Sequence, residues 1–169
     1  MQKVKVFRAG RLGILFFALT VLLAGAIFYM SGEPATASGA RSGSLAENIL
    51  KLFYPQYDTL SAAAQAALLA SADHLLRKCT HFCVYAALGG LFLLDSLCFA
   101  AKPATHILRA LLCAALYASS DEIHQAFVPG RGPAVTDVLL DSAGALCGIL
   151  AVWAIVYLIR RRKAKHANR

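Results

Sequence analysis

Polar side chains that can bind ligands or transfer protons recur at helical spacing in three stretches of the chain. The first stretch comprises His74, Lys78, His81 and Tyr85. The second comprises Tyr117, Asp121, Glu122, His124 and Gln125, and the third comprises Asp137 and Asp141. Apart from Glu122, which points to another side, the residues of each stretch are spaced so that they share one helix face.

Histidine beside carboxylates is a combination suited to acid–base chemistry, because the carboxylate orients the imidazole. The candidate catalytic residues are therefore Asp121, Glu122, His124, His81 and Asp137. Nucleophilic catalysis has little support, since the serines nearby lie in no recognisable nucleophile motif: Ser119, Ser120 and Ser142.

The same stretches are also suited to holding an anionic group. Lys78 and Arg131 can bind phosphate or carboxylate, and arginine offers a bidentate grip. The candidate ligand-binding residues are Lys78, Tyr85, Gln125, Arg131 and Asp141. A metal held by the histidines and acids is chemically feasible, but their spacing matches neither HExxH nor a cysteine-based site. No metal ligands are assigned, and the cofactor is left unknown.

The elements that must position these residues are membrane helices. Of the 169 residues 59% are hydrophobic, and the mean hydropathy of +0.60 is too high for an ordinary soluble domain. Runs of about 20 apolar residues can cross roughly 30 Å of hydrocarbon. The predicted spans are residues 12–30, 82–101, 107–120 and 138–159, the third being short and leading into the polar run at Asp121. The expected fold is all-α, an integral membrane bundle of four transmembrane helices.

The basic residues predict the orientation of this bundle. Twelve of the 17 Lys and Arg lie in residues 1–11, at Lys102 and Arg109 around the start of the third span, or in the tail 160–169. The positive-inside rule therefore places both termini in the cytoplasm and all three polar stretches on the other side. The turn Pro129-Gly-Arg-Gly-Pro133 holds Arg131 at that same end. The net charge of +8 is explained by basic residues that contact anionic lipid headgroups at the membrane surface. Membrane lipids are therefore the expected partners, and no nucleic-acid partner is expected.

An extra non-cytoplasmic helical segment is expected between the first two spans. Residues 31–43 are rich in Gly, Ser, Pro and Ala, as linkers are, and Ser44 to Glu47 fits a capping box that starts a helix ended by Pro55. Residues 59–70 predict a short helix against the bundle or the membrane interface, with a loosely ordered loop as the alternative. The first span is too long for the core of a signal peptide, which favours a retained anchor helix.

Small residues and cysteines indicate how the helices pack. Gly144 and Gly148 form a small-xxx-small surface, which allows close approach of another helix and makes an oligomer through this pair possible. The five cysteines include no CxxC pair, and we interpret them as packing residues.

Three ordered motifs resemble the VanZ-like family of bacterial membrane proteins. They are Arg77-Lys-x-x-His81-x-x-x-Tyr85, the run Tyr117-Ala-x-x-Asp-Glu-Ile-His-Gln-x-Phe-Val-Pro-Gly-Arg131, and Asp137-x-x-x-Asp141-x-x-Gly144-x-x-x-Gly148. The match covers residues 77–148, residues before 77 contribute little, and Asp141 lies where the family often has Asn. The resemblance implies a VanZ-like transmembrane domain over residues 12–159 and a multi-pass location in the bacterial cytoplasmic (plasma) membrane. It also implies a cell-envelope role, since a family member is associated with resistance to the glycopeptide antibiotic teicoplanin.

Three functions are open at this point. The first is an outward-facing polar pocket that binds an envelope lipid or glycopeptide-related ligand, with or without modifying it, and contributes to teicoplanin resistance. The second is a lipid-headgroup hydrolase or transferase that uses His81 or His124 as its base. The third is a non-catalytic membrane partner whose polar residues only fasten the helix ends together. Whether the protein is an enzyme is left open.

Overall fold

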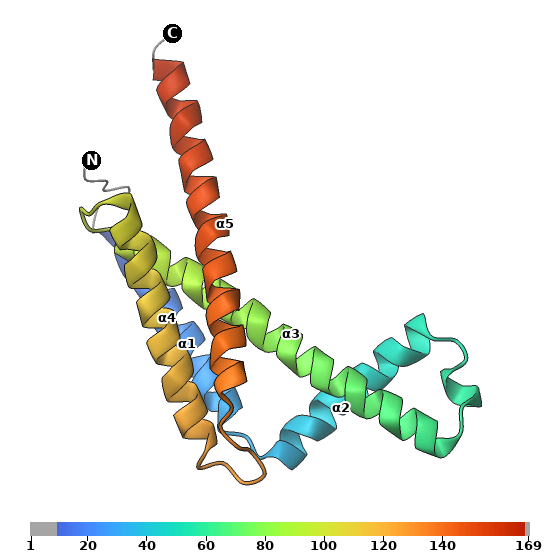
Figure 1. Ribbon diagram of the computed structural model, residues 1–169. Coiled ribbons are helices and arrows are strands. Elements are labelled where there is room, and N and C mark those ends of the chain that lie inside the picture. Colours follow the sequence, from blue (N-terminus) through green and yellow to red (C-terminus); the bar gives the residue numbers. More distant parts are fainter. Residues whose placement is uncertain (1–9, 168–169) are drawn as a thin grey trace.

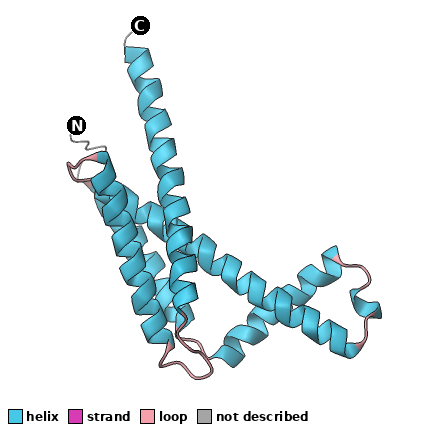
Figure 2. Cartoon of the chain, viewed as in Figure 1, coloured by secondary structure: helices cyan, strands magenta, loops and turns pink. Residues whose placement is uncertain are grey.

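The computed structural model describes residues 10–167, and these residues form helices and no strand (Figures 1 and 2). The helices are α1 Arg11–Ser31, α2 Ala35–Phe53, α3 Ala62–Ser96, α4 Pro103–Gln125 and α5 Val135–Ala167, with a 3-10 turn, η1, at Tyr57–Thr59. The predicted all-α class is confirmed. Most of the predicted basic N-terminus, residues 1–9, lies outside the described residues.

Helices α1, α3, α4 and α5 form a bundle in which α3 contacts each of the other three (Figure 1). Among the described residues, α1, α3 and α5 are long and apolar enough to cross a membrane. Helix α4 has 23 residues, and a helix of that length extends about 34 Å at 1.5 Å per residue. Helix α4 is not among the described helices that are apolar enough to cross a membrane, so the fourth span stays a prediction.

The bundle is tightest between α3 and α5, where the helix backbones touch. A Cβ added to Gly144 or Gly148 would overlap the carbonyl oxygen of Phe82 or Ala86 on α3. Close approach through a small-xxx-small surface was the prediction for this pair. These contacts lie within one chain, and an oligomer through the same pair stays a prediction.

Helix α4 turns a stripe of small residues towards the bundle. Ala110, Ala114 and Ala118 are at most 1% exposed, and the stripe continues through the buried Asp121 and Gln125. Alanine at every fourth position lets α4 approach its neighbours closely, as small residues do in membrane bundles. The last turn of α4 therefore carries its polar side chains into a packed interface.

The predicted linker at 31–43 and the capping box at Ser44 are wrong. Helix α2 begins at Ala35, directly after Pro34, and Ser44 lies in its interior. Pro34 supplies a fixed φ of −54° and needs no partner for an N–H group, and the alanines that follow favour a helix. The end of α2 at Phe53, just before Pro55, agrees with the prediction.

The predicted short helix at 59–70 is also wrong as a separate element. Ser61 caps a helix at Ala62, accepting a hydrogen bond from the Ala64 N–H at 3.4 Å, and this helix runs unbroken to Ser96. No Gly or Pro interrupts residues 62–88, and alanine has the highest helix propensity. One 35-residue helix, α3, therefore carries both the second span and a segment that projects from the bundle beside α2 (Figure 1).

Candidate ligand cavity

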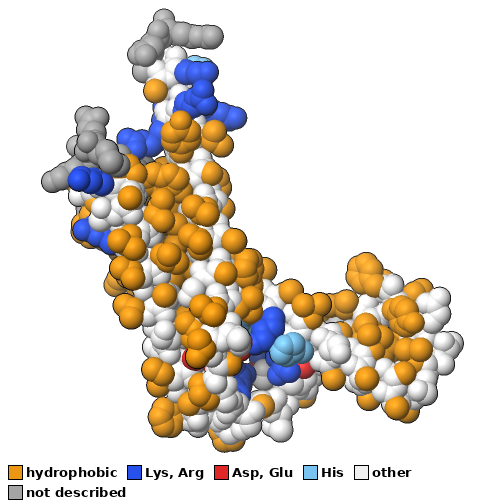
Figure 3. Space-filling view, in the orientation of Figure 1, with side chains coloured by type: hydrophobic (Ala, Val, Ile, Leu, Met, Phe, Trp, Pro, Cys, Tyr) orange, Lys and Arg blue, Asp and Glu red, His pale blue; other side chains and the backbone are white. Residues whose placement is uncertain are grey.

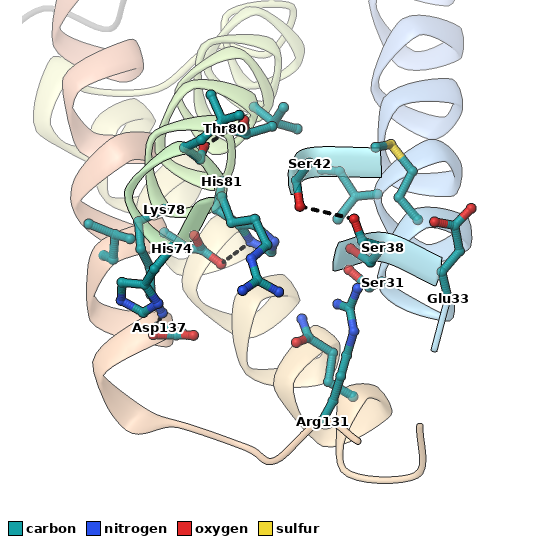
Figure 4. A pocket seen from close by; sticks show the side chains of 18 of the residues that line it. Ser31, Glu33, Ser38, Ser42, His74, Lys78, Thr80, His81, Arg131 and Asp137 are labelled. Atoms are coloured by element: carbon teal, nitrogen blue, oxygen red, sulfur yellow. Dashed lines mark hydrogen bonds and ion pairs between the residues drawn. The ribbon is translucent and has the colours of Figure 1, made fainter. Parts of the chain in front are cut away.

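A cavity of about 450 Å³ lies where α1, α2 and α3 meet the connection between α4 and α5 (Figure 4). Eight of the polar residues singled out in the sequence line it: His74, Lys78, His81, Tyr85, Gln125, Arg131, Asp137 and Asp141. They come from α3, α4, α5 and the α4–α5 connection. The structure thus brings the three polar stretches to one place.

The cavity lies at the end of the bundle opposite Arg11 and the C-terminal end of α5 (Figure 1). In Figure 3, hydrophobic side chains cover the bundle between Lys and Arg near the C-terminus and a second polar patch where α3 leaves the bundle. Such an apolar band between two polar ends is typical of a membrane protein. Which end faces the cytoplasm stays a prediction.

Three of the basic side chains around the cavity are held by acids. Arg41 on α2 makes two hydrogen bonds to the Glu33 carboxylate, at 2.7 and 2.8 Å, which raises the pKa of the Arg41 guanidinium. Arg77 pairs with Asp73 at 2.8 Å one helical turn earlier on α3, and Lys78 pairs with Asp137 at the start of α5. Local acids therefore balance most of the positive charge here.

Arg131 differs from these three. Among the described residues its guanidinium makes no ion pair. Figure 4 shows its side chain rising from the α4–α5 connection into the cavity, towards Ser31 at the end of α1. Gly130 takes a φ of +78°, a left-handed conformation that glycine adopts readily, and so forms the tight turn before Arg131. The connection thus presents an unpaired cation to the cavity.

Asp121 joins three helices behind the cavity wall. Its Oδ2 accepts hydrogen bonds from Ser31 Oγ on α1 at 3.0 Å, Tyr85 Oη on α3 at 3.3 Å and Gln125 Nε2 on α4 at 3.1 Å. The Asp121 side chain is buried, and its second oxygen, Oδ1, has no hydrogen-bond partner among the described residues. One carboxylate oxygen is thus fully engaged while the other is left open.

His81 and Asp141 form a second pair across the α3–α5 interface. The distance from His81 Nδ1 to Asp141 Oδ2 is 3.5 Å. Asp141 is completely buried, and its Oδ1 has no hydrogen-bond partner among the described residues. The His81 side chain remains 30% exposed on the cavity wall. The imidazole can therefore reach both the buried acids and a bound ligand.

Three predicted catalytic residues do not line the cavity: Asp121, which lies behind its wall, Glu122 and His124. The Glu122 carboxylate accepts a hydrogen bond from the Ala134 N–H at 2.8 Å, which anchors the α4–α5 connection. The His124 ring stacks on Phe28 of α1, with ring centroids 4.1 Å apart. Of the two predicted histidine bases, only His81 lines the cavity. Glu122 and His124 hold neighbouring elements in place.

Several cavity residues were not assigned to the site from the sequence, because they lie before or beside the predicted polar stretches: Ser31, Glu33, Ser38, Arg41, Ser42 and Arg77. The first five belong to the segment predicted as a linker, in which the relative placement of Glu33 and Arg41 cannot be deduced. The available signal was Pro34 followed by alanine, an arrangement that starts helices. A helix at that point places Arg41 about two turns after Glu33 on the same side.

A comparison with protein-family models matches residues 16–159 to the family described as VanZ/LLP1. This confirms the resemblance inferred from residues 77–148 and extends it through α1 and α2. No curated protein and no solved structure matches the chain.

Proposed function

The chain belongs to the VanZ/LLP1 family, and we propose that its cavity binds the anionic headgroup of a bacterial envelope lipid. The observation that carries the proposal is Arg131, an arginine without an ion-pair partner among the described residues, extended into the cavity. A guanidinium in a partly enclosed site attracts phosphate strongly and can bind two of its oxygens at once. Lys78 and His81 on the opposite wall provide further donors.

The remaining wall suits the apolar part of a lipid. Ile27, Met30, Leu45, Val84 and Leu140 line the cavity together with the polar side chains. A site with both kinds of wall accommodates a headgroup next to the start of its acyl chains, whereas a soluble anion would use only the polar half. The predicted orientation places this site at the outer face of the cytoplasmic membrane, where envelope lipids are accessible.

Lipid capture from an envelope extract tests this proposal. The purified protein would be incubated with total envelope lipids, isolated again, and its retained lipids identified by mass spectrometry. We expect anionic lipids to be enriched on the wild type and largely lost from Arg131→Gln. The matched control is Arg109→Gln, an exposed arginine of α4 near the opposite end of the bundle. Equal enrichment of anionic lipids on all three proteins would contradict the role of Arg131, and no enrichment on the wild type would favour the structural-partner alternative.

A second candidate, a lipid-headgroup hydrolase or transferase, is favoured by one observation. His81 lies on the cavity wall beside the buried Asp141, a histidine–carboxylate arrangement that can support general-base catalysis. The same incubation separates the candidates, because a hydrolase or transferase changes the mass of the lipid and a binding protein returns it intact. Modified products that disappear in His81→Gln would favour the enzyme.

Resistance to teicoplanin is the most specific part of the proposal, and it rests on the family resemblance. If the cavity holds the ligand responsible, a susceptible strain expressing the wild type should tolerate more teicoplanin than one expressing Arg131→Gln at equal membrane abundance. Equal tolerance in the two strains would contradict a role of this cavity in teicoplanin resistance.

A further inference from the structure

Two buried aspartates and one histidine meet beneath the cavity, and they come from three different helices. One potential ligand atom each from His81 on α3, Asp121 on α4 and Asp141 on α5 lie within 4.8 Å of one another. Asp121 is 2% exposed and Asp141 is 0% exposed, whereas His81 opens onto the cavity. Atoms this close can all contact one ion at about 2.0–2.2 Å after small side-chain rotations.

The hydrogen bonds around these residues leave ligand atoms open. Ser31, Tyr85 and Gln125 all donate to the same oxygen of Asp121, Oδ2, so Oδ1 is unpartnered and buried. Asp141 Oδ1 is likewise unpartnered and buried. Buried carboxylate oxygens are costly to leave without a hydrogen bond or a counter-ion. Metal-binding carboxylates characteristically have outer donors that fix one oxygen while the other binds the metal.

Charge balance points the same way. Two carboxylates buried among membrane helices are strongly destabilising unless a positive charge compensates them. Lys78, the one lysine of α3, is already paired with Asp137. A divalent cation would neutralise both aspartates, with His81 as a neutral nitrogen ligand.

From this geometry we propose that His81, Asp121 and Asp141 bind a divalent transition-metal ion, with Zn²⁺ or Mn²⁺ matching the nitrogen and oxygen ligands. Three protein ligands leave a coordination position open, as in catalytic zinc sites. Since His81 borders the cavity, that position faces the space that Arg131 enters. A phosphate oxygen of the proposed lipid can then bind the ion while Arg131 binds the other oxygens. This assignment gives His81 the role of a ligand instead of a base.

The metal site uses the proposed cavity, but its test contains no lipid, so the two proposals can fail separately. Protein purified without a histidine tag and stripped with chelator would be titrated with Zn²⁺ by calorimetry. We expect one equivalent to bind the wild type, with affinity at least about tenfold weaker in Asp121→Asn and Asp141→Asn. The control variants are Asp95→Asn, a carboxylate on α3 that accepts a hydrogen bond from Thr20, and His74→Gln, a histidine on the same cavity wall.

Thermal unfolding distinguishes a variant that has lost the metal site from a variant that folds poorly. Saturating Zn²⁺ should raise the Tm of the wild type and both controls, because ligand binding stabilises the folded state. At the same Zn²⁺ concentration the Tm of Asp141→Asn should rise by clearly less, because its site binds the ion more weakly. Co²⁺ provides a spectroscopic check, since binding to a site of this kind gives visible absorption bands. A wild type that takes up no stoichiometric Zn²⁺, or an Asp121→Asn and Asp141→Asn pair that bind it like the controls, would overturn the proposal.

Discussion

Lys78 of α3 and Asp137 in the first turn of α5 form an ion pair at the point where α3 leaves the bundle. Both side chains are about one-third exposed or less, so water screens the pair only in part. The negative charge of Asp137 also suits the N-terminal end of a helix. The contact fixes the start of α5 against the cavity wall.

Removing one partner of this pair should lower stability modestly. We expect Lys78→Gln to cost about 1 kcal/mol, in line with partly exposed ion pairs. The exchange Lys78→Asp with Asp137→Lys should recover part of that loss, whereas either single reversal should be worse than Lys78→Gln. Thermal unfolding in detergent measures all four variants. An exchange variant less stable than both single reversals would contradict the pairing.

A larger loss is expected at the α3–α5 contact. Gly148→Ala places a Cβ against the backbone of Ala86, which cannot move without separating the helices. Forcing extra atoms into a packed interface typically costs about 1–3 kcal/mol, so the Tm should fall by several degrees. Gly25→Ala in α1 is the matched control, because nothing lies within 4 Å of its added Cβ. A Tm for Gly148→Ala equal to or above that of the control would argue against the close packing.

His124 should behave as a packing residue. Replacing it with Phe keeps a ring against Phe28, so His124→Phe should retain both membrane abundance and lipid capture. Loss of the ring in His124→Ala should lower the Tm, with lipid capture per folded molecule unchanged. If His124→Phe folds normally but captures no lipid, His124 takes part in binding and the structural role is incorrect.

The orientation of the bundle has a direct test by cysteine labelling. The native cysteines would be replaced, and single cysteines introduced as Gly132→Cys beside Arg131 and Lys163→Cys in the basic tail. Both sites are exposed. A membrane-impermeant maleimide should label Gly132→Cys in intact cells and Lys163→Cys only after permeabilisation. Labelling of both from the same side would contradict the topology and the outward-facing cavity.

The sequence was sufficient for the apolar helices and for the convergence of the polar stretches. Length and hydropathy are properties of a segment alone, and helical spacing already placed His74, Lys78, His81 and Tyr85 on the cavity face of α3. The small pair Gly144 and Gly148 likewise indicated a close helix contact.

Cross-helix partners could not be deduced in the same way. Helical spacing assigned His124 to the polar face with Asp121, but only the position of α1 decides that its ring lies against Phe28. The open oxygens of Asp121 and Asp141 depend on donors from three helices, which no local pattern specifies. The second half of α2 was predicted, but its first half, residues 35–43, was taken as a linker because its small residues gave no apolar periodicity.

The central claim, an anionic lipid headgroup held by Arg131, is tested most directly by a binding titration with one defined lipid. Phosphatidylglycerol, with zwitterionic phosphatidylcholine as the comparison without net charge, would be titrated into the wild type, Arg131→Gln and Arg109→Gln in neutral detergent. We predict saturable binding of phosphatidylglycerol to the wild type and Arg109→Gln. Arg131→Gln should bind it about tenfold or more weakly, since a charge-assisted hydrogen bond is worth roughly 1.5–3 kcal/mol. Equal affinity of Arg131→Gln and the wild type, or equal binding of both lipids, would contradict the claim.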